Sequence, residues 1–278
     1  MSCALRPNRL GGCYRARQKV SSILNLPLEV LDSFQRGAIR SLAVSWHGLG
    51  NIQMEQDKAN CVEAFKEAIG LFHYIGDQSG EASSALNLGT AYKDIPGIRN
   101  LEQAERWYQH SLELCDRSDH LRRGQCLGQL GRVFYERFKE ARVARQPEEE
   151  QLRHLTYAHW LLHQALDAFP PNAVDDLAQA HHQLGITYNE LRNLNCALSH
   201  YYQAINYFEV AGNIHQSAGT RLSVAIALAQ VEHFDDALLY AQAALHNYET
   251  YSERAAADIQ NARQLIAMIE QDLAAKGG

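Results

Sequence analysis

Residues 184–204 read LGITYNELRNLNCALSHYYQA, and this stretch decides the fold. A Leu-Gly pair opens it, Tyr188 lies three residues after the glycine, and Ala197, Tyr201 and Ala204 follow at spacings of four and three. Such spacings place side chains on one face of a helix. Because glycine and alanine are small, two helices can approach closely, and the tyrosines fill the space that is left. The stretch therefore predicts two antiparallel helices packed tightly together.

The same pattern occurs five times along the 278 residues. The paired residues that mark the first helix are Leu49-Gly50, Leu88-Gly89, Leu130-Gly131, Leu184-Gly185 and Val224-Ala225. The small, bulky and small residues that mark the second helix are Cys61/Phe65/Ala68, Ala104/Tyr108/Ser111, Ala158/Leu162/Ala165, Ala197/Tyr201/Ala204 and Ala237/Ala241/Ala244. One such hairpin cannot bury its apolar stripe alone, so neighbouring hairpins must stack. The repeat therefore predicts an all-α solenoid.

This pattern resembles the tetratricopeptide repeat, whose signature is W-x2-L-G-x2-Y followed by A-x3-F. Residues 46–50 match the opening of the signature, and residues 88–92 and 184–188 match its middle. The resemblance covers roughly residues 38–250. It implies a right-handed α-solenoid of about five helix hairpins with a C-terminal capping helix, and a surface that binds other proteins.

The repeats are longer than usual. Their glycines, with one alanine, lie at positions 50, 89, 131, 185 and 225, nearer 40 residues apart than the usual ~34. Gly76-Asp77 and Gly212-Asn213 come after second helices, where glycine suits a helix C-cap. This longer form is similar to the repeats of kinesin light chains, cell-polarity scaffolds and many bacterial signalling proteins.

The repeats set the expected layout of the chain. Residues 1–37 are a basic N-terminal segment or leading helix, residues 38–250 hold the repeats, and residues 252–275 form the capping helix. The individual repeats are expected at about 38–77, 80–119, 122–169, 175–213 and 215–250. The third is extended: Pro147 cannot lie inside a helix, but strong helix formers flank it, so we expect a turn there between two lengthened helices.

Composition narrows the class of protein. The net charge of −6 argues against general nucleic-acid binding, which normally needs a basic face. No apolar run approaches the ~18 residues that a membrane span requires. The six cysteines form no CxxC pair and fit a reducing compartment, so we expect a cytoplasmic protein. The first 28 residues contain no acid and five basic residues, which fits either a frayed leading helix, the interpretation we favour, or a mitochondrial-type presequence.

The resemblance also implies where a partner binds, because the first helix of each repeat lines a concave groove in such proteins. The side chains expected in the groove are His47, Asn51, Asn87, Thr90, Lys93, Gln129, Arg132, Tyr135, His182, Gln183, Ile186 and Asn189. Several are amides, which offer both a donor and an acceptor and can pair with the backbone of an extended peptide of any sequence. A protein or peptide partner is therefore expected, with no cofactor or metal. A solvated polar face without a ligand is the alternative.

Two narrower hypotheses concern parts of this surface. One subclass of the family grips the C-terminal carboxylate of chaperone tails with two Asn and several basic residues. Asn51 and Asn87 occupy the two Asn positions, but Gln125 and Gln129 stand where basic residues would be. Alternatively, a partner docks on the turn near Pro147, which three consecutive glutamates follow.

The sequence carries no motif for catalysis. It has no GxxxxGK[ST] phosphate loop, no GxSxG elbow and no HExxH pair. His159 and His163 are four residues apart with His154 upstream, but a zinc site normally needs a third and a fourth ligand. We therefore expect a non-enzymatic interaction scaffold. The alternatives are a regulatory sensor module of a bacterial signalling system, associated with a STAND-type ATPase or another effector, and a metal-dependent enzyme that uses the His-rich third repeat.

Overall fold

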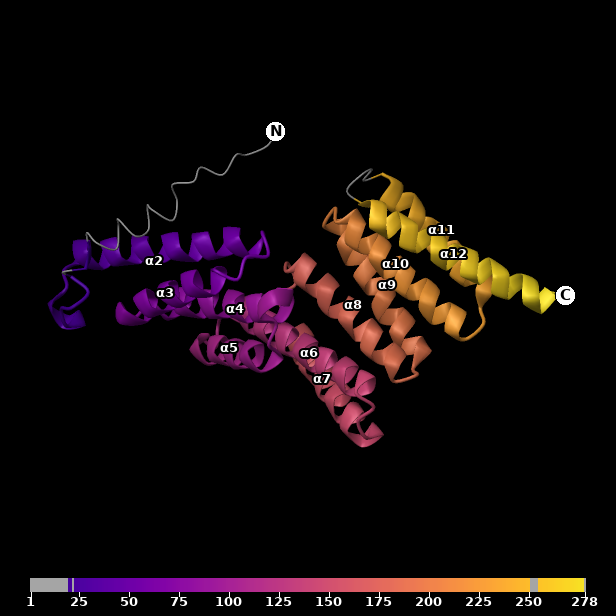
Figure 1. Cartoon of the computed structure of the whole chain (residues 1–278), viewed down its shortest axis with the longest axis horizontal. Helices are drawn as coiled ribbons and strands as arrows, with labels where there is room; N and C mark the ends of the chain where they lie inside the picture. The colour runs from indigo at the N-terminus through magenta and orange to yellow at the C-terminus, as the bar shows by residue number, and fades with distance from the viewer. Residues whose placement is uncertain (1–19, 22, 251–254, 278) are drawn as a thin grey trace. The chain divides into compact units, whose positions relative to one another are not determined.

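The computed structural model describes residues 20, 21, 23–250 and 255–277, and every regular element within them is helical (Figure 1). The chain divides into two compact units, one ending at Arg137 and one beginning at Phe138. The elements of the first unit are η1 (Leu28–Val30), α2 (Ser33–Met54), α3 (Cys61–Tyr74), α4 (Gln78–Asp94), η2 (Pro96–Ile98) and α5 (Leu101–Leu114). The helix α6 (His120–Val143) runs across the boundary. The elements of the second unit are α7 (Glu148–Ala168), α8 (Val174–Glu190), α9 (Leu194–Val210), α10 (Ile214–Gln230), α11 (Phe234–Glu249) and α12 (Ala256–Gly277).

Helices that follow each other in the chain pack as hairpins. In the first unit α2 packs on α3 and α4 on α5, and in the second unit α8 packs on α9 and α10 on α11 (Figure 1). A short turn joins α6 to α7. Neighbouring hairpins also touch within each unit, through α3 and α4 and through α9 and α10. The prediction of an all-α fold built from stacked helix hairpins is confirmed.

The residues of the repeat pattern form the cores of both units. Every Leu-Gly or Val-Ala pair is buried, and so is every small or bulky residue of the second-helix pattern. The glycines lie directly against aromatic rings: an added Cβ at Gly89 would be 2.7 Å from a ring carbon of Tyr108, and one at Gly185 would be 2.4 Å from a ring carbon of Tyr201. These two helix pairs therefore approach as closely as the small residues allow.

The turns between helices repeat one backbone conformation. Gly76 and Gly212 have φ of +71° and +73°, so their predicted role as helix C-caps is confirmed. The residue after each glycine donates its N–H back to the helix, Asp77 to the Phe72 carbonyl at 2.9 Å and Asn213 to the Phe208 carbonyl at 2.7 Å. This is the hydrogen bond of the Schellman motif.

Two further turns of the second unit use the same conformation without glycine. Arg192 and Glu232 have φ of +59° and +66°. The following residues again donate to the helix, Asn193 to the Tyr188 carbonyl and His233 to the Leu228 carbonyl. A left-handed backbone at a residue with a Cβ costs roughly 1 kcal/mol. These turns are therefore strained relative to the glycine turns.

This difference gives a matched prediction. We expect Glu232→Gly to raise the free energy of unfolding by about 0.5 kcal/mol, and Gly212→Ala to lower it by about 1 kcal/mol. Urea unfolding followed by circular dichroism measures both changes. If both variants shift the midpoint in the same direction, the two turns do not share one conformation.

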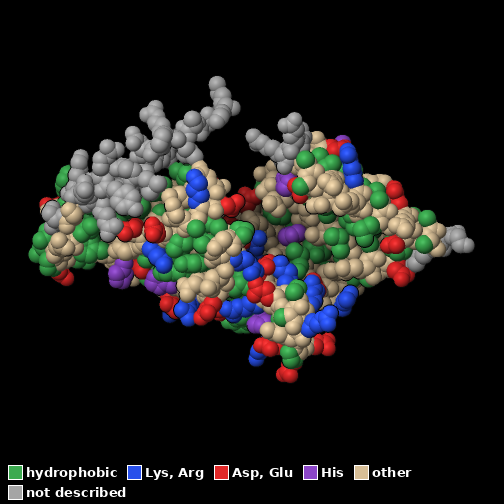
Figure 2. Space-filling model, viewed as in Figure 1, with side chains coloured by type: hydrophobic (Ala, Val, Ile, Leu, Met, Phe, Trp, Pro, Cys, Tyr) green, Lys and Arg blue, Asp and Glu red, His purple; other side chains and the backbone are tan. Residues whose placement is uncertain are grey.

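The third repeat is longer than its neighbours. The helix α6 has 24 residues and α7 has 21, whereas α8, α9 and α10 have 17 each. Pro147 lies just before α7, and Arg145 in the turn has φ of +52°. Figure 2 shows acidic and basic side chains intermixed over this end of the α6–α7 hairpin. The expected turn near Pro147 is therefore present.

The two ends of the helical region are capped differently. At the start of α2 the Asp32 side chain accepts from the Gln35 N–H at 2.7 Å, and the Gln35 side chain accepts from the Asp32 N–H. At the other end α12 packs on α11, and Ile269 is buried in the core that α9, α10 and α11 share. Residues 1–19, with the presequence alternative, lie outside the described residues. None of the helices that the structure describes is long and apolar enough to cross a membrane.

Candidate partner-binding faces

In the first unit, the expected groove residues of α2 and α4 contact each other. His47 Nδ1 lies 2.9 Å from Ser84 Oγ, and Asn87 Nδ2 donates to Asn51 Oδ1 at 2.8 Å. Both bonds join residues about one repeat apart. Burial lowers the pKa of His47, with a smaller contribution from the charge of Arg122, so the imidazole is neutral at pH 7. The two first helices thus share a neutral polar seam.

A buried tyrosine continues this seam toward α6. The Tyr108 hydroxyl donates to Thr90 Oγ1 at 3.1 Å and lies 3.5 Å from Gln129 Oε1. Burial raises the pKa of Tyr108, which keeps the phenol protonated as a donor. Thr90 and Gln129 were expected to face a ligand, whereas Tyr108 was expected only to fill the core. The seam therefore includes a residue of α5, the second helix of its repeat, where no groove residue was expected.

Lys93 differs most from an open groove residue. Its side chain is only 5% exposed, and Nζ lies 2.5 Å from Asp94 Oδ1. Burial lowers the pKa of Lys93, and the nearby Arg132 lowers it further, while Asp94 and Glu136 raise it. Arg132 and Tyr135, on α6, are half-buried. The Lys93 ammonium is thus paired with Asp94, and little of its side chain is open to solvent.

The second unit repeats part of the arrangement of the first. His182 Nδ1 lies 3.1 Å from Thr220 Oγ1, and Asn189 Nδ2 donates to Gln230 Oε1 at 3.1 Å. His182 and His47 both lie three residues before the glycine of their repeats, so the imidazole–hydroxyl bond recurs at equivalent positions. The amide bond does not, because Asn51 lies one residue and Asn189 four residues after the glycine of its repeat.

Two expected residues of α8 are largely covered. Gln183 is buried, and its Nε2 has no hydrogen-bond partner. Ile186 is half-buried and packs against the apolar core of the second unit. The structure thus brings together His47, Asn51, Asn87, Thr90 and Gln129 on the first unit and His182 and Asn189 on the second.

Histidines and a tyrosine form a half-buried cluster on α7, α8 and α9 of the second unit. His181 Nδ1 lies 3.0 Å from His200 Nδ1, and His163 Nε2 lies 3.1 Å from the Tyr188 hydroxyl. The ring of His159 packs edge-on against both His163 and Tyr188. Sequence analysis identified only the pair on α7, because His181 and His200 lie on different helices.

Burial and neighbouring imidazoles lower the pKa of three histidines in this cluster. Burial is the largest cause of a lowered pKa at His159, His181 and His200, and the neighbouring imidazoles lower each value further. For His200 the pKa falls to about 4. Among the described residues, no three His, Cys, Asp or Glu side chains are placed to hold a metal ion. The imidazoles contact each other in pairs, as packing residues do.

An exposed aromatic pair on α7 was not foreseen. Tyr157 and Trp160 are 43% and 49% exposed, and their rings stack with centroids 5.3 Å apart. Leu152, 43% exposed, lies on the same helix. Exposed tyrosine and tryptophan are typical anchors of protein interfaces. Their spacing of three residues was visible in the sequence, but the repeat pattern assigned this helix only a core role.

Sequence comparison finds no family model that matches this chain and no curated protein that matches it. Solved structures do match. Aspartyl phosphate phosphatase F from Bacillus subtilis aligns with a TM-score of 0.58 at 12% identity, covering 99% of this chain and 76% of that chain. A Rap protein complexed with competence and sporulation factor aligns with a TM-score of 0.56 at 15% identity, covering 94% and 77%. The chain has a tetratricopeptide-like fold.

A third structure adds to this finding. BtubC (BKLC) from P. vanneervenii aligns with a TM-score of 0.53 at 15% identity and covers 82% of this chain and 92% of that chain. At such identities the likeness concerns the fold alone. It establishes the helix-hairpin repeat that the sequence predicted. The evidence for a binding site comes from this chain's own residues.

Proposed function

We propose that this protein is a non-enzymatic scaffold that binds a partner protein, or an extended segment of one, on the faces that first helices form within its two units. The observation that carries the proposal is that each unit has an amide–amide bond between first helices, Asn51 with Asn87 and Asn189 with Gln230, although the two bonds lie at different positions of the repeat. Each contact uses one N–H and one oxygen, so every amide keeps further hydrogen-bonding groups. Because each amide is held by its neighbour, those groups lie at fixed positions, which reduces the entropy lost on binding.

The surrounding residues favour an uncharged, backbone-directed mode of binding. The imidazoles His47 and His182 are each tied to a hydroxyl, and Lys93 is buried beside Asp94. The face of the first helices therefore offers amides rather than free cations at these positions. An extended peptide backbone, with alternating donors and acceptors, matches such a surface better than a C-terminal carboxylate does. We therefore favour a partner segment over the chaperone-tail hypothesis.

Replacing the amide pair tests the proposal. We expect Asn51→Ala/Asn87→Ala to weaken capture of the partner from native lysate by about tenfold or more, because an unpaired buried polar group costs about 1–3 kcal/mol. The matching pair in the second unit, Asn189→Ala/Gln230→Ala, shows whether both units take part. Captured proteins are quantified by mass spectrometry, with helicity verified by circular dichroism.

The control removes amides from second helices. Gln109 on α5 and Gln203 on α9 are both exposed, so Gln109→Ala/Gln203→Ala changes the same chemistry away from the proposed face. Capture by this control should equal capture by the unchanged protein. If both face variants also capture the partner undiminished, binding lies elsewhere, and the stacked pair Tyr157 and Trp160 becomes the leading candidate.

The proposal extends to the limits of the binding module and to its location in the cell. We propose that the long repeats at 38–250 are the binding module, that residues 1–37 lead into it and that residues 252–275 cap it. The protein would act in the cytoplasm, where its thiols stay reduced; the four cysteines that the structure describes are free.

The regulatory alternative is a sensor module of a bacterial signalling system. It is favoured by the fold shared with a Rap protein that is complexed with competence and sporulation factor. A sensor must change its conformation when its ligand binds, whereas a passive scaffold need not. Hydrogen exchange with and without the captured partner distinguishes them. Protection confined to contact helices supports a scaffold, and altered exchange throughout a unit supports a sensor.

A further inference from the structure

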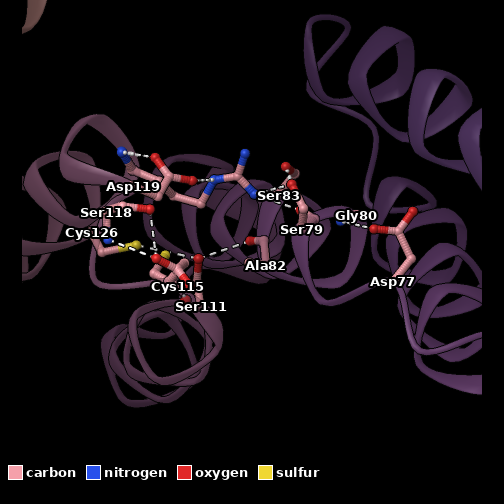
Figure 3. Close-up of polar contacts among 12 residues, drawn as sticks. Asp77, Ser79, Gly80, Ala82, Ser83, Ser111, Cys115, Ser118, Asp119 and Cys126 are labelled. Atoms are coloured by element: carbon pink, nitrogen blue, oxygen red, sulfur yellow. Dashed lines mark hydrogen bonds and ion pairs between the residues drawn. The ribbon is translucent and has the colours of Figure 1, made fainter.

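Two cysteine thiols meet at the turn between α5 and α6. Cys115 ends α5 and donates from Sγ to the Ser111 carbonyl at 3.0 Å. Cys126 on α6 donates from Sγ to Ser111 Oγ at 3.2 Å. Ser111 in turn donates to the Ala82 carbonyl on α4 at 2.8 Å (Figure 3). The two thiols thus bond to the same buried serine, and each affects the pKa of the other.

The environments of the two thiols differ. Cys126 is fully buried, whereas Cys115 is partly exposed at the end of its helix. The neighbouring Cys126 thiol lowers the pKa of Cys115, burial raises it, and the charge of Arg122 lowers it again. The neighbouring Cys115 thiol and burial raise the pKa of Cys126. A partly exposed thiol whose pKa is lowered, beside a buried thiol whose pKa is raised, is the arrangement found in redox-sensing cysteine pairs.

Arg122 is held in place beside this pair. Its Nε lies 3.3 Å from Asp119 Oδ2, and its Nη1 donates to the Ser79 carbonyl (Figure 3). Because these contacts tie α6 to the start of α4, the guanidinium keeps a fixed position. Its charge therefore acts on Cys115 in the folded protein.

We propose that Cys115 and Cys126 form an oxidation site whose co-substrate is a hydroperoxide. The Cys115 thiolate attacks a peroxide oxygen, the O–O bond breaks, and with hydrogen peroxide the departing hydroxide takes a proton and leaves as water. Cys115 is now a sulfenic acid. The Cys126 sulfur then attacks the Cys115 sulfur, the S–O bond breaks and an S–S bond forms. The hydroxyl leaves as a second water with the Cys126 proton.

The overall step is balanced, and a thiol reductant reverses it. Two thiols supply two electrons and two protons, and one hydrogen peroxide becomes two waters. The disulfide would tie the end of α5 to α6 and take the Cys126 sulfur away from Ser111. Reversible disulfides of this kind are those expected in a reducing compartment.

The other described cysteines lack this arrangement. Cys61 is buried, and burial raises the pKa of its thiol. Cys196 is half-buried and follows the N-cap of α9. They provide internal standards for the reactivity of Cys115 in the same molecule.

The experiment treats the reduced full chain with hydrogen peroxide, alkylates the remaining thiols and digests the protein with trypsin. Arg117, Arg122 and Arg123 lie between the two cysteines, so a disulfide appears as two linked peptides. We expect the Cys115–Cys126 link, abolished by dithiothreitol. Cys126→Ser should stop at a sulfenic acid on Cys115 that dimedone traps, and Cys115→Ser should give neither product. The control Cys61→Ser should still form the link.

A second measurement needs no variant. In the unchanged protein, Cys115 should react with iodoacetamide several-fold faster than Cys196 at pH 7, and its rate should reach a plateau at lower pH. The proposal is overturned if peroxide leaves Cys115 and Cys126 unlinked, or if Cys115 alkylates no faster than Cys196. It is also overturned if folded Cys126→Ser gives no sulfenic acid at Cys115.

Discussion

Replacing Gly50 with alanine should lower the free energy of unfolding by about 2 kcal/mol, within the range for overpacking a close-packed core. An alanine Cβ at this position would lie 2.6 Å from Phe65 Cε1, well inside van der Waals contact. Phe65 is completely buried in a core that it shares with Ala85 and Leu88, so a shift of its ring disturbs that packing. The helices α2 and α3 must therefore separate or the ring must leave its preferred rotamer.

The control lies two residues away on the same helix. A Cβ at Gly48 would meet no atom within 4 Å. Because alanine favours the helix over glycine, Gly48→Ala should raise the free energy of unfolding by about 0.5–1 kcal/mol. Urea unfolding of the full chain, followed by circular dichroism, compares the two. A Gly50→Ala protein as stable as the unchanged one would contradict the close approach of the two helices.

Lowering the pH from 7 to 4 should destabilise the second unit through its histidine cluster. The pKa of His200 is about 4, while a histidine in an unfolded chain has a pKa of about 6.5. As the pH falls below 6.5, His200 binds a proton in the unfolded chain but not in the folded protein. Stability is therefore lost progressively down to about pH 4. The loss is on the order of 2–3 kcal/mol for His200.

The variant His200→Asn separates this effect from general acid destabilisation. Its amide lies near the position of Nδ1 and can still pair with His181, but it does not titrate. We expect the unfolding midpoint of His200→Asn to fall less steeply between pH 6.5 and 4 than that of the unchanged protein. The control His246→Asn removes an exposed histidine of α11, outside the cluster. Equal slopes for all three proteins would show that the cluster is accessible to protons in the folded state.

The sequence predicts the helix hairpins well because their packing depends on residue size at fixed spacings. Leu88-Gly89 and Ala104/Tyr108/Ser111 lie in the core as their spacing requires. The glycine turns are predicted for the same local reason. By contrast, the turns at Arg192 and Glu232 adopt the glycine conformation without glycine, so residue type alone gives no signal there.

The candidate site was less predictable because its contacts join residues far apart in sequence. The spacing of the repeats places His47, Asn51 and Asn87 on first helices, but it does not show that these side chains bond to neighbouring repeats. Lys93 was expected in the groove because its position along the helix suits a groove residue, but the sequence does not show that its side chain is 5% exposed and paired with Asp94. Pairwise contacts of this kind depend on the rotation between adjacent hairpins, which one sequence does not specify.

Site-specific photo-crosslinking tests the proposed binding face most directly. A photoreactive phenylalanine analogue replaces one tyrosine at a time: Tyr135 on the proposed face, Tyr157 on the exposed side of α7, or Tyr202, exposed on the second helix α9. The three probes share one chemistry, so differences report position. We predict that the captured partner crosslinks to the probe at 135 and not to the probe at 202. A crosslink from 157 or 202 with none from 135 would contradict binding on the face of the first helices.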